Sequence, residues 1–121
     1  YKNSNMLLQV NPGGADANLY NDDSWYKHWQ FEAQDDYFYI KNCDTGQYLW
    51  YDTLRDGAKL GASDTKGWNN RFKLVTDLRA STFSIRPYAD TRYCVDISGR
   101  DNSLPQQEDK VQIWTYYGTF M

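Results

Sequence analysis

Short runs in which hydrophobic and polar residues alternate recur along the whole chain. Two of them, residues 93–98 and 110–115, lie close together in the last third of the sequence. A period of two is typical of a β-strand with one buried face. In the first run, Val95 and Ile97 would point to the core, so Asp96 would point away from it.

The second run repeats this arrangement with different polar residues. Val111 and Ile113 alternate with Gln112 and Trp114, so the amide and the indole would lie on the outer side of the strand. If the two strands are neighbours, the carboxylate of Asp96 shares that side with them. A hydrogen-bond acceptor, an amide and a flat apolar ring together suit a sugar, which makes this face the candidate binding site.

The strand pattern continues elsewhere, and no segment of ten or more residues has the 3.6-residue period of a helix. We expect further strands at residues 6–10, 17–21, 26–33, 37–41, 47–51, 58–62, 71–75 and 81–86. Residues 42–46 predict a hairpin turn. Within residues 26–33, Trp29 and Phe31 are expected to point inward. The sequence therefore predicts an all-β chain of short strands.

The strand signals also recur at a regular distance of about 42 to 45 residues. The matching sets are Leu8, Trp50 and Val95; Leu19, Leu60 and Val111; Trp29, Phe72 and Phe120; and the pairs Phe38 with Ile40 and Phe83 with Ile85. A unit of this length cannot bury its own hydrophobic face, so three copies are expected to share one core, as in a β-trefoil. A seven-stranded sandwich is the alternative, but it gives no reason for such a repeat.

We therefore expect one domain over residues 1–121, with repeats at about 1–35, 36–80 and 81–121. An inserted loop at residues 100–109 explains the longer spacing in the third repeat. In this register the first strand of the first repeat and the last strand of the third are missing or clipped. The chain is accordingly expected to be part of a longer protein, with strand edges that an adjoining segment or another chain fills.

The composition excludes several classes of protein. A length of 121 residues allows one hydrophobic core. The net charge of −3 argues against a nucleic-acid partner, which would require a basic surface. No apolar run approaches the roughly 20 residues of a membrane span. The sequence contains no paired nucleophile and base and no phosphate-binding loop, so we expect neither enzymatic activity nor a cofactor.

Other reactive side chains give weaker signals. A disulfide between Cys43 and Cys94 and two free thiols are both compatible with the sequence. Pairs of acids, as at Asp35 and Asp36, are typical of solvated turns rather than of metal sites. The single histidine, His28, is expected to be an outward polar residue without a functional role.

The two runs first considered resemble one repeat of the ricin B-type trefoil lectins. The resemblance rests on Tyr-Cys-Val-Asp-Ile-Ser-Gly at residues 93–99 followed, after a loop, by Lys-Val-Gln-Ile-Trp at residues 110–114. Trp29 and Phe72 take the place of the Trp in the family's Gln-x-Trp signature, but neither has Gln two residues before it. The similarity spans nearly the whole chain through its register and spacing, and it implies a secreted or cell-surface carbohydrate-binding module.

The resemblance also implies which residues would hold the sugar, of galactose type. In that family, an acid on the second strand of a repeat accepts hydrogen bonds from sugar hydroxyls, an aromatic ring stacks on the sugar, and an amide completes the contacts. The matching residues here are Asp96, Gln112 and Trp114, with Tyr116 or Tyr117 extending the aromatic platform. The family's Asn-Gln pair before the fourth strand has no counterpart. The alternative is that Asp96 pins a turn and Trp114 packs against a loop.

The other two repeats are not expected to bind a sugar in this way. In place of the acid, amide and indole, the first repeat offers Gln9, Tyr20 and Asp22, and the second offers Tyr51, Gly61 and Ser63. The sequence thus predicts one binding site, in a module that targets a larger toxin or glycoside hydrolase to glycans. The competing hypothesis is a protein-interaction trefoil, a toxin subunit or a protease inhibitor, whose loop at residues 100–109 contacts a protein partner.

Overall fold

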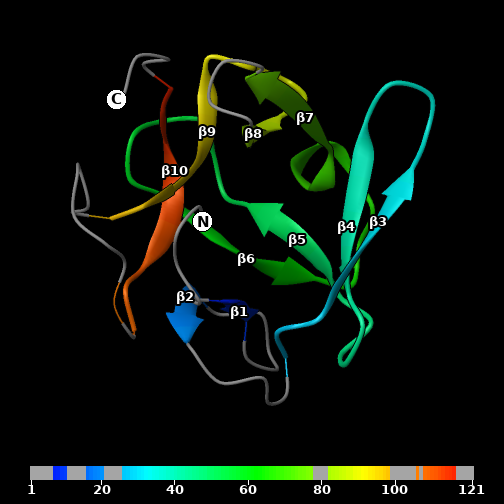
Figure 1. Cartoon of the computed structure of the whole chain (residues 1–121). Coiled ribbons are helices and arrows are strands. Elements are labelled where there is room, and N and C mark those ends of the chain that lie inside the picture. The colour runs from blue at the N-terminus through cyan, green and yellow to red at the C-terminus, as the bar shows by residue number, and fades with distance from the viewer. Residues whose placement is uncertain are drawn as a thin grey trace.

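The computed structural model describes residues 7–10, 16–20, 26–77, 82–98, 106 and 108–116, and this part of the chain contains ten strands and one short 3₁₀ helix. The elements are β1 (Leu7–Val10), β2 (Ala17–Tyr20), β3 (Trp29–Ala33), β4 (Phe38–Asn42), β5 (Tyr48–Tyr51), β6 (Ala58–Ser63), η1 (Trp68–Asn70), β7 (Phe72–Asp77), β8 (Thr82–Pro87), β9 (Tyr93–Ile97) and β10 (Val111–Thr115) (Figure 1). The expected all-β architecture is confirmed.

Antiparallel pairing joins most of these strands into one curled sheet. Its order is β8-β7-β4-β5-β6-β10-β9, with β3 on the other edge of β4, while β1 and β2 form a separate hairpin. Strands β8 and β9, at the two ends of the order, lie beside each other. The β1–β2 hairpin sits below β6 in Figure 1, where β2 contacts both β6 and β10.

Three hairpins are arranged around one another with the same register. β6 pairs with β10 through Gln112 opposite Lys59, and β2 meets the start of β10 through Asn18 opposite Lys110. A loop residue just before each contact also donates its backbone N–H to the neighbouring hairpin. Gly57 donates to the carbonyl of Ile113, and Glu108 donates to the carbonyl of Leu19. This threefold arrangement is that of the β-trefoil that the sequence predicts.

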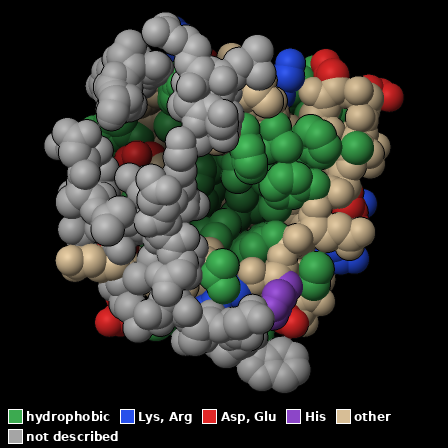
Figure 2. All heavy atoms as spheres, viewed as in Figure 1, with side chains coloured by type: hydrophobic (Ala, Val, Ile, Leu, Met, Phe, Trp, Pro, Cys, Tyr) green, Lys and Arg blue, Asp and Glu red, His purple; other side chains and the backbone are tan. Residues whose placement is uncertain are grey.

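The core lies where the inner faces of the hairpins and the sheet meet. Its fully buried members include Leu49, Leu60, Phe72 and Ile113. The predicted inward orientation of Val111 and Ile113 is confirmed, while Val95 and Ile97 are partly buried and pack against the core. Figure 2 shows hydrophobic side chains gathered over η1 and the adjoining part of β4, beside a hollow near β5.

Two edges of the sheet expose a large hydrophobic side chain. Phe31 on β3 is 40% exposed rather than inward, because β3 has only β4 as a neighbour among the described strands. The ring of Phe31 packs sideways against the ring of Phe38. Phe83 on β8, whose only described strand partner is β7, is 56% exposed as well, an orientation on which the sequence made no prediction. The expectation of missing or clipped strands concerns positions before Tyr1 and after Phe120, which the described residues do not test, so it stays a prediction.

The strand boundaries follow the prediction within one or two residues, with two exceptions. β3 begins at Trp29 and not at Tyr26, because Tyr26 has a φ of +72°, outside the range of a strand. The helix η1 has no helical pattern in the sequence, since a single 3₁₀ turn is too short to show a period. Cys43 and Cys94 are free thiols, so they form no disulfide.

Candidate functional site

Asp96 and Gln112 face each other across the β9–β10 hairpin, as the alternation predicts. They are directly opposed in the antiparallel register, and the Gln112 side-chain Nε2 donates to Oδ2 of Asp96 over 3.5 Å. At this length the hydrogen bond is weak. Gln112 lies on the predicted face of β10 but is only 7% exposed, so its amide is largely shielded from solvent. The amide serves to orient the carboxylate of Asp96.

Trp114 lies on the same face of the hairpin, two residues along β10, and is opposite Cys94. Its side chain is 36% exposed, which leaves part of the indole open to solvent. The loop between β5 and β6 lies against this ring, since a methyl group placed on Gly57 would be 3.8 Å from Cζ3 of Trp114.

The end of β10 is held in place by Asp56, the residue before that glycine. Oδ1 of Asp56 accepts hydrogen bonds from the backbone N–H of Thr115 over 2.7 Å and from its hydroxyl over 2.6 Å. Sequence analysis did not identify Asp56 or Gly57, because they belong to another hairpin. An Asp-Gly dipeptide signals a turn, but nothing in the sequence shows which strand the turn supports.

Cationic and aromatic groups complete the surroundings of the site. The guanidinium of Arg86 lies 3.8 Å from the ring centroid of Tyr116, two residues after Trp114; that Tyr116 extends the aromatic platform stays a prediction. The thiol of Cys94 is half-buried, and this burial, reinforced by the nearby charge of Asp96, raises its pKa to about 11. The thiol is therefore protonated and unreactive at neutral pH. Tyr117, the fourth residue predicted for the site, lies outside the described residues.

The threefold register identifies the corresponding positions in the other two hairpins. Asn18 and Gly61 take the place of Gln112, and their cross-strand partners, Gln9 and Trp50, take the place of Asp96. The residues at the position of Trp114 are then Tyr20 and Ser63. The alignment of the repeats by sequence was therefore wrong at three of the six positions. Two of these follow from matching Leu19 with Val111, whereas the structure matches Ala17 with Val111. The third follows from matching Trp50 with Val95, whereas the structure matches Trp50 with Asp96.

This correction changes the interpretation of the first hairpin. Gln9 is 8% exposed, and its Nε2 donates to Oδ1 of Asn18 over 3.4 Å, much as Gln112 donates to Asp96. Tyr20 provides an aromatic ring at the position of Trp114, with the ammonium of Lys27 5.5 Å from its centroid. The first hairpin thus has an amide pair and an aromatic ring but no carboxylate. The second hairpin, with Trp50, Gly61 and Ser63, has no polar pair.

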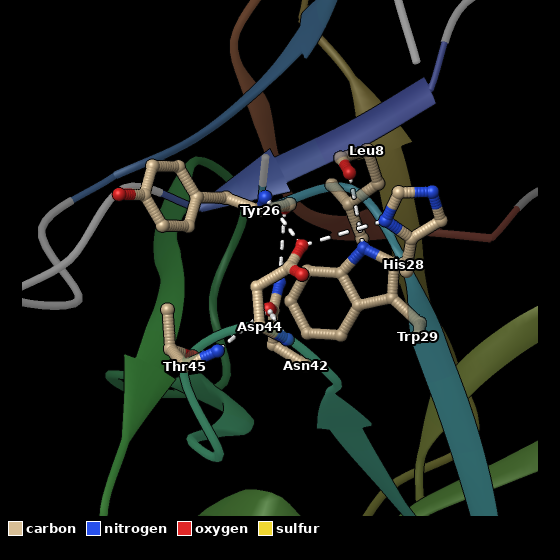
Figure 3. A network of polar contacts seen from close by, with 7 residues as sticks. All are labelled: Leu8, Tyr26, His28, Trp29, Asn42, Asp44 and Thr45. Carbon is tan, nitrogen blue, oxygen red and sulfur yellow. Dashed lines mark hydrogen bonds and ion pairs between the residues drawn. The ribbon is translucent and has the colours of Figure 1, made fainter. Parts of the chain in front are cut away.

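A separate polar network surrounds the single histidine (Figure 3). Oδ2 of Asp44 accepts a hydrogen bond from the backbone N–H of Tyr26 over 2.7 Å and lies 3.4 Å from Nδ1 of His28. Asn42, which is fully buried, accepts hydrogen bonds from the N–H groups of Asp44 and Thr45 and donates one to the carbonyl of Tyr26. These hydrogen bonds hold the turn between β4 and β5 against Tyr26 and His28, the residues just before β3. The network therefore has a structural role.

Other classes of site receive no support from the residues whose positions are known. No group of three or more His, Cys, Asp or Glu side chains in the described ranges is placed to hold a metal ion. In the same ranges, no helix is long and apolar enough to cross a membrane. His28 is exposed, as expected, and interacts with the side chain of Asp44.

Comparison with known proteins identifies the class of this domain. Residues 25–114 match the model of the ricin-type β-trefoil lectin-like domain family. Because this match covers most of the 121 residues, the chain belongs to that family. The matched residues include Asp96, Gln112 and Trp114. A comparison with curated proteins finds no significant match.

Solved structures share the fold at low sequence identity. A designed threefold-symmetric protein, ThreeFoil, aligns over 94% of this chain and 84% of its own at 20% identity with a TM-score of 0.77. A ricin B-like lectin from Macrolepiota procera, solved with lactose, aligns over 93% and 79% at 21% identity with a TM-score of 0.77. The Haemophilus ducreyi cytolethal distending toxin aligns over 97% and 71% at 16% identity with a TM-score of 0.74. The β-trefoil fold is thereby confirmed.

Proposed function

We propose that this domain binds carbohydrate through the face of the β9–β10 hairpin. The observation that carries the proposal is the placement of Asp96 and Trp114 on one face of neighbouring strands, with the Asp96 carboxylate oriented by Gln112. A carboxylate accepts strong hydrogen bonds from sugar hydroxyls, and an exposed indole offers a rigid apolar plate for the sugar ring. Membership in a lectin-like family supports the same function.

The sugar is of galactose type in this proposal, and binding is non-catalytic. A related fold solved with lactose, which contains galactose, supports this choice. A single shallow site is expected to bind weakly, with a Kd on the order of 0.1 to 1 mM, so useful avidity requires further sites. The domain would then act as the targeting part of a larger secreted or cell-surface protein, a toxin or a glycoside hydrolase.

Titration with lactose, N-acetylgalactosamine, mannose and xylose, followed by tryptophan fluorescence, tests the proposal. Asp96→Ala and Trp114→Ala should each weaken binding at least tenfold, because each removes a group that touches the sugar. Tyr20→Ala is the matched control on the first hairpin, which has no carboxylate, and it should have a smaller effect. If no sugar binds, or if the Asp96 and Trp114 variants bind like the wild type, the proposal is wrong.

The second candidate function is docking onto a protein partner. It is supported by the similarity of the fold to parts of toxins, including a mosquitocidal holotoxin that aligns over 98% of this chain but only 14% of its own at 16% identity with a TM-score of 0.77. In this case the loop at residues 100–109 would carry the interaction. Deletion of residues 101–108 should then abolish partner binding and leave any sugar binding intact.

A further inference from the structure

An exposed tryptophan outside the three hairpins is the starting point for a further proposal. Trp68, the first residue of η1, is 59% exposed, more than any other large hydrophobic side chain in the described ranges. Its neighbours are aromatic or charged: the ring of Tyr88 stacks nearly parallel to it at 13° and 6.2 Å between centroids, and the guanidinium of Arg71 lies 4.2 Å from its centroid. We call this region the Trp68 surface; it comprises Asp36, Tyr37, Trp68, Arg71, Lys73 and Tyr88.

The backbone that carries Trp68 is held rigidly from the core. Oδ1 of the buried Asn70 accepts a hydrogen bond from the N–H of Gly67, and its Nδ2 donates to the carbonyl of Leu49. Asn69 donates to the carbonyl of Tyr51 over 2.8 Å, and the Tyr51 hydroxyl donates to the carbonyl of Trp68. An exposed indole on so firmly anchored a turn loses little conformational freedom on binding.

The β7–β8 hairpin places cations beside this indole. Arg71 and Lys73 flank the buried Phe72, so both lie on the outer face of β7. Tyr88 donates its N–H to the carbonyl of Arg71, and the ammonium of Lys73 lies 5.9 Å from the ring centroid of Tyr88. Neither Arg71 nor Lys73 forms an ion pair with a carboxylate in the part of the chain that the structure describes. The guanidinium of Arg71 is also stacked against Tyr37, 4.8 Å from the ring centroid.

Acidic groups lie on the Trp68 surface as well. The hydroxyl of Tyr88 donates to Oδ2 of Asp36 over 2.7 Å, and this hydrogen bond raises the pKa of Tyr88, so the phenol stays protonated. Asp35 is close enough to Tyr37 to act on it electrostatically. Charges of both signs therefore meet the same rings, because Arg71 and Lys73 lie against Tyr37 and Tyr88 while Asp36 accepts the hydrogen bond from the Tyr88 hydroxyl.

From this arrangement we propose that the Trp68 surface binds a sugar that carries a carboxylate, of the sialic or uronic acid class. The apolar face of the sugar ring would stack on the indole of Trp68. Its carboxylate would pair with the guanidinium of Arg71, with Lys73 contributing charge. Hydroxyl groups at the far end of the sugar would donate to Asp36. This binding site is separate from the face of Asp96 and Trp114 and does not depend on the function proposed for it.

The test compares sugars with and without a carboxylate. Binding of 3′-sialyllactose, methyl glucuronide and lactose to the wild-type chain is followed by calorimetry and saturation-transfer NMR. The two carboxylated sugars should bind, and lactose, which 3′-sialyllactose contains, should not compete with methyl glucuronide. Arg71→Gln removes an ionic hydrogen bond to the carboxylate, and Trp68→Ala removes the stacking partner of the sugar ring. Each variant should bind the carboxylated sugars at least tenfold more weakly than the wild type. Raising the salt concentration should weaken it as well.

Two variants make the result specific. Arg55→Gln removes an exposed arginine from the loop after β5, and carboxylate binding should be unchanged. Trp114→Ala should weaken lactose binding but not that of methyl glucuronide, which separates the two sites. The proposal is overturned if neither carboxylated sugar binds at about 10 mM, or if Trp68→Ala and Arg71→Gln both bind them like the wild type. It is also overturned if Trp68→Ala abolishes binding of a protein partner while no carboxylated sugar binds.

Discussion

Replacing Gly57, which lies against Trp114, tests the left-handed backbone that it shares with its counterpart Glu108. Gly57 has a φ of +83°, a left-handed conformation that favours glycine, and its N–H donates to the carbonyl of Ile113 over 2.8 Å. A side chain in this conformation costs about 1 to 2 kcal/mol. The added methyl group of Gly57→Ala would lie at an ordinary contact distance of 3.8 Å from Trp114, so we expect no clash.

The unfolded state reduces the net effect. Alanine has fewer unfolded conformations than glycine, which offsets about 0.5 kcal/mol of the strain. Gly57→Ala should therefore destabilise the domain by about 1 kcal/mol. Urea unfolding followed by tryptophan fluorescence measures this value, and the dependence on denaturant should be unchanged, because the same surface is buried.

Glu108 provides the reciprocal experiment at the matching position. It has a φ of +68°, and its N–H donates to the carbonyl of Leu19 over 2.7 Å. Glu108→Gly should relieve the strain and stabilise the domain by about 0.5 to 1 kcal/mol. The argument fails if Gly57→Ala is as stable as the wild type while Glu108→Gly loses stability. A loss above about 3 kcal/mol in Gly57→Ala would instead reveal a clash with the indole.

Three further changes follow from the same structure. Asn70→Ala leaves the carbonyl of Leu49 and the N–H of Gly67 without their side-chain partner and should lower the free energy of unfolding by about 3 kcal/mol; a loss below about 1 kcal/mol would mean that water replaces the amide. Asp56→Ala removes both hydrogen bonds to Thr115 and should cost about 1 kcal/mol and weaken sugar binding, whereas Asp52→Ala, an exposed acid in the same loop, should change neither quantity. The raised pKa of Cys94 leaves about a hundredfold less thiolate than an ordinary cysteine has at pH 8, and the greater nucleophilicity of that thiolate offsets part of this difference. Iodoacetamide should therefore alkylate Cys94 about tenfold more slowly than the exposed Cys43, as measured by peptide mass spectrometry. Equal rates would contradict the burial of the Cys94 thiol.

The sequence alone determined the strands and the face on which the candidate site lies. Alternation has a period of two, so once residues 93–98 and 110–115 are strands, Asp96 must share a face with Gln112 and Trp114 when the strands pair in this register. The all-β class and the threefold architecture followed from the same patterns and from the spacing of about 42 to 45 residues.

The alignment of the three hairpins could not be obtained in this way. A shift of two residues preserves the alternation, so Leu19 and Ala17 are equally good matches to Val111 by pattern. Only the pairing of Asn18 with Lys110 and of Gln112 with Lys59 decides between them. That choice gives the first hairpin Asn18 and Tyr20 at the site positions.

Contacts between distant segments were also decided only by the tertiary structure. Asp56 bonds to Thr115 and Gly57 lies against Trp114, both from another hairpin, and the burial of Gln112 depends on its surroundings rather than on its own strand. The Trp68 surface combines residues from η1, β7 and the turns before β4 and after β8, each of which has an ordinary local sequence. Local patterns specify which way a side chain points along its strand, but packing between strands specifies which other side chains it meets.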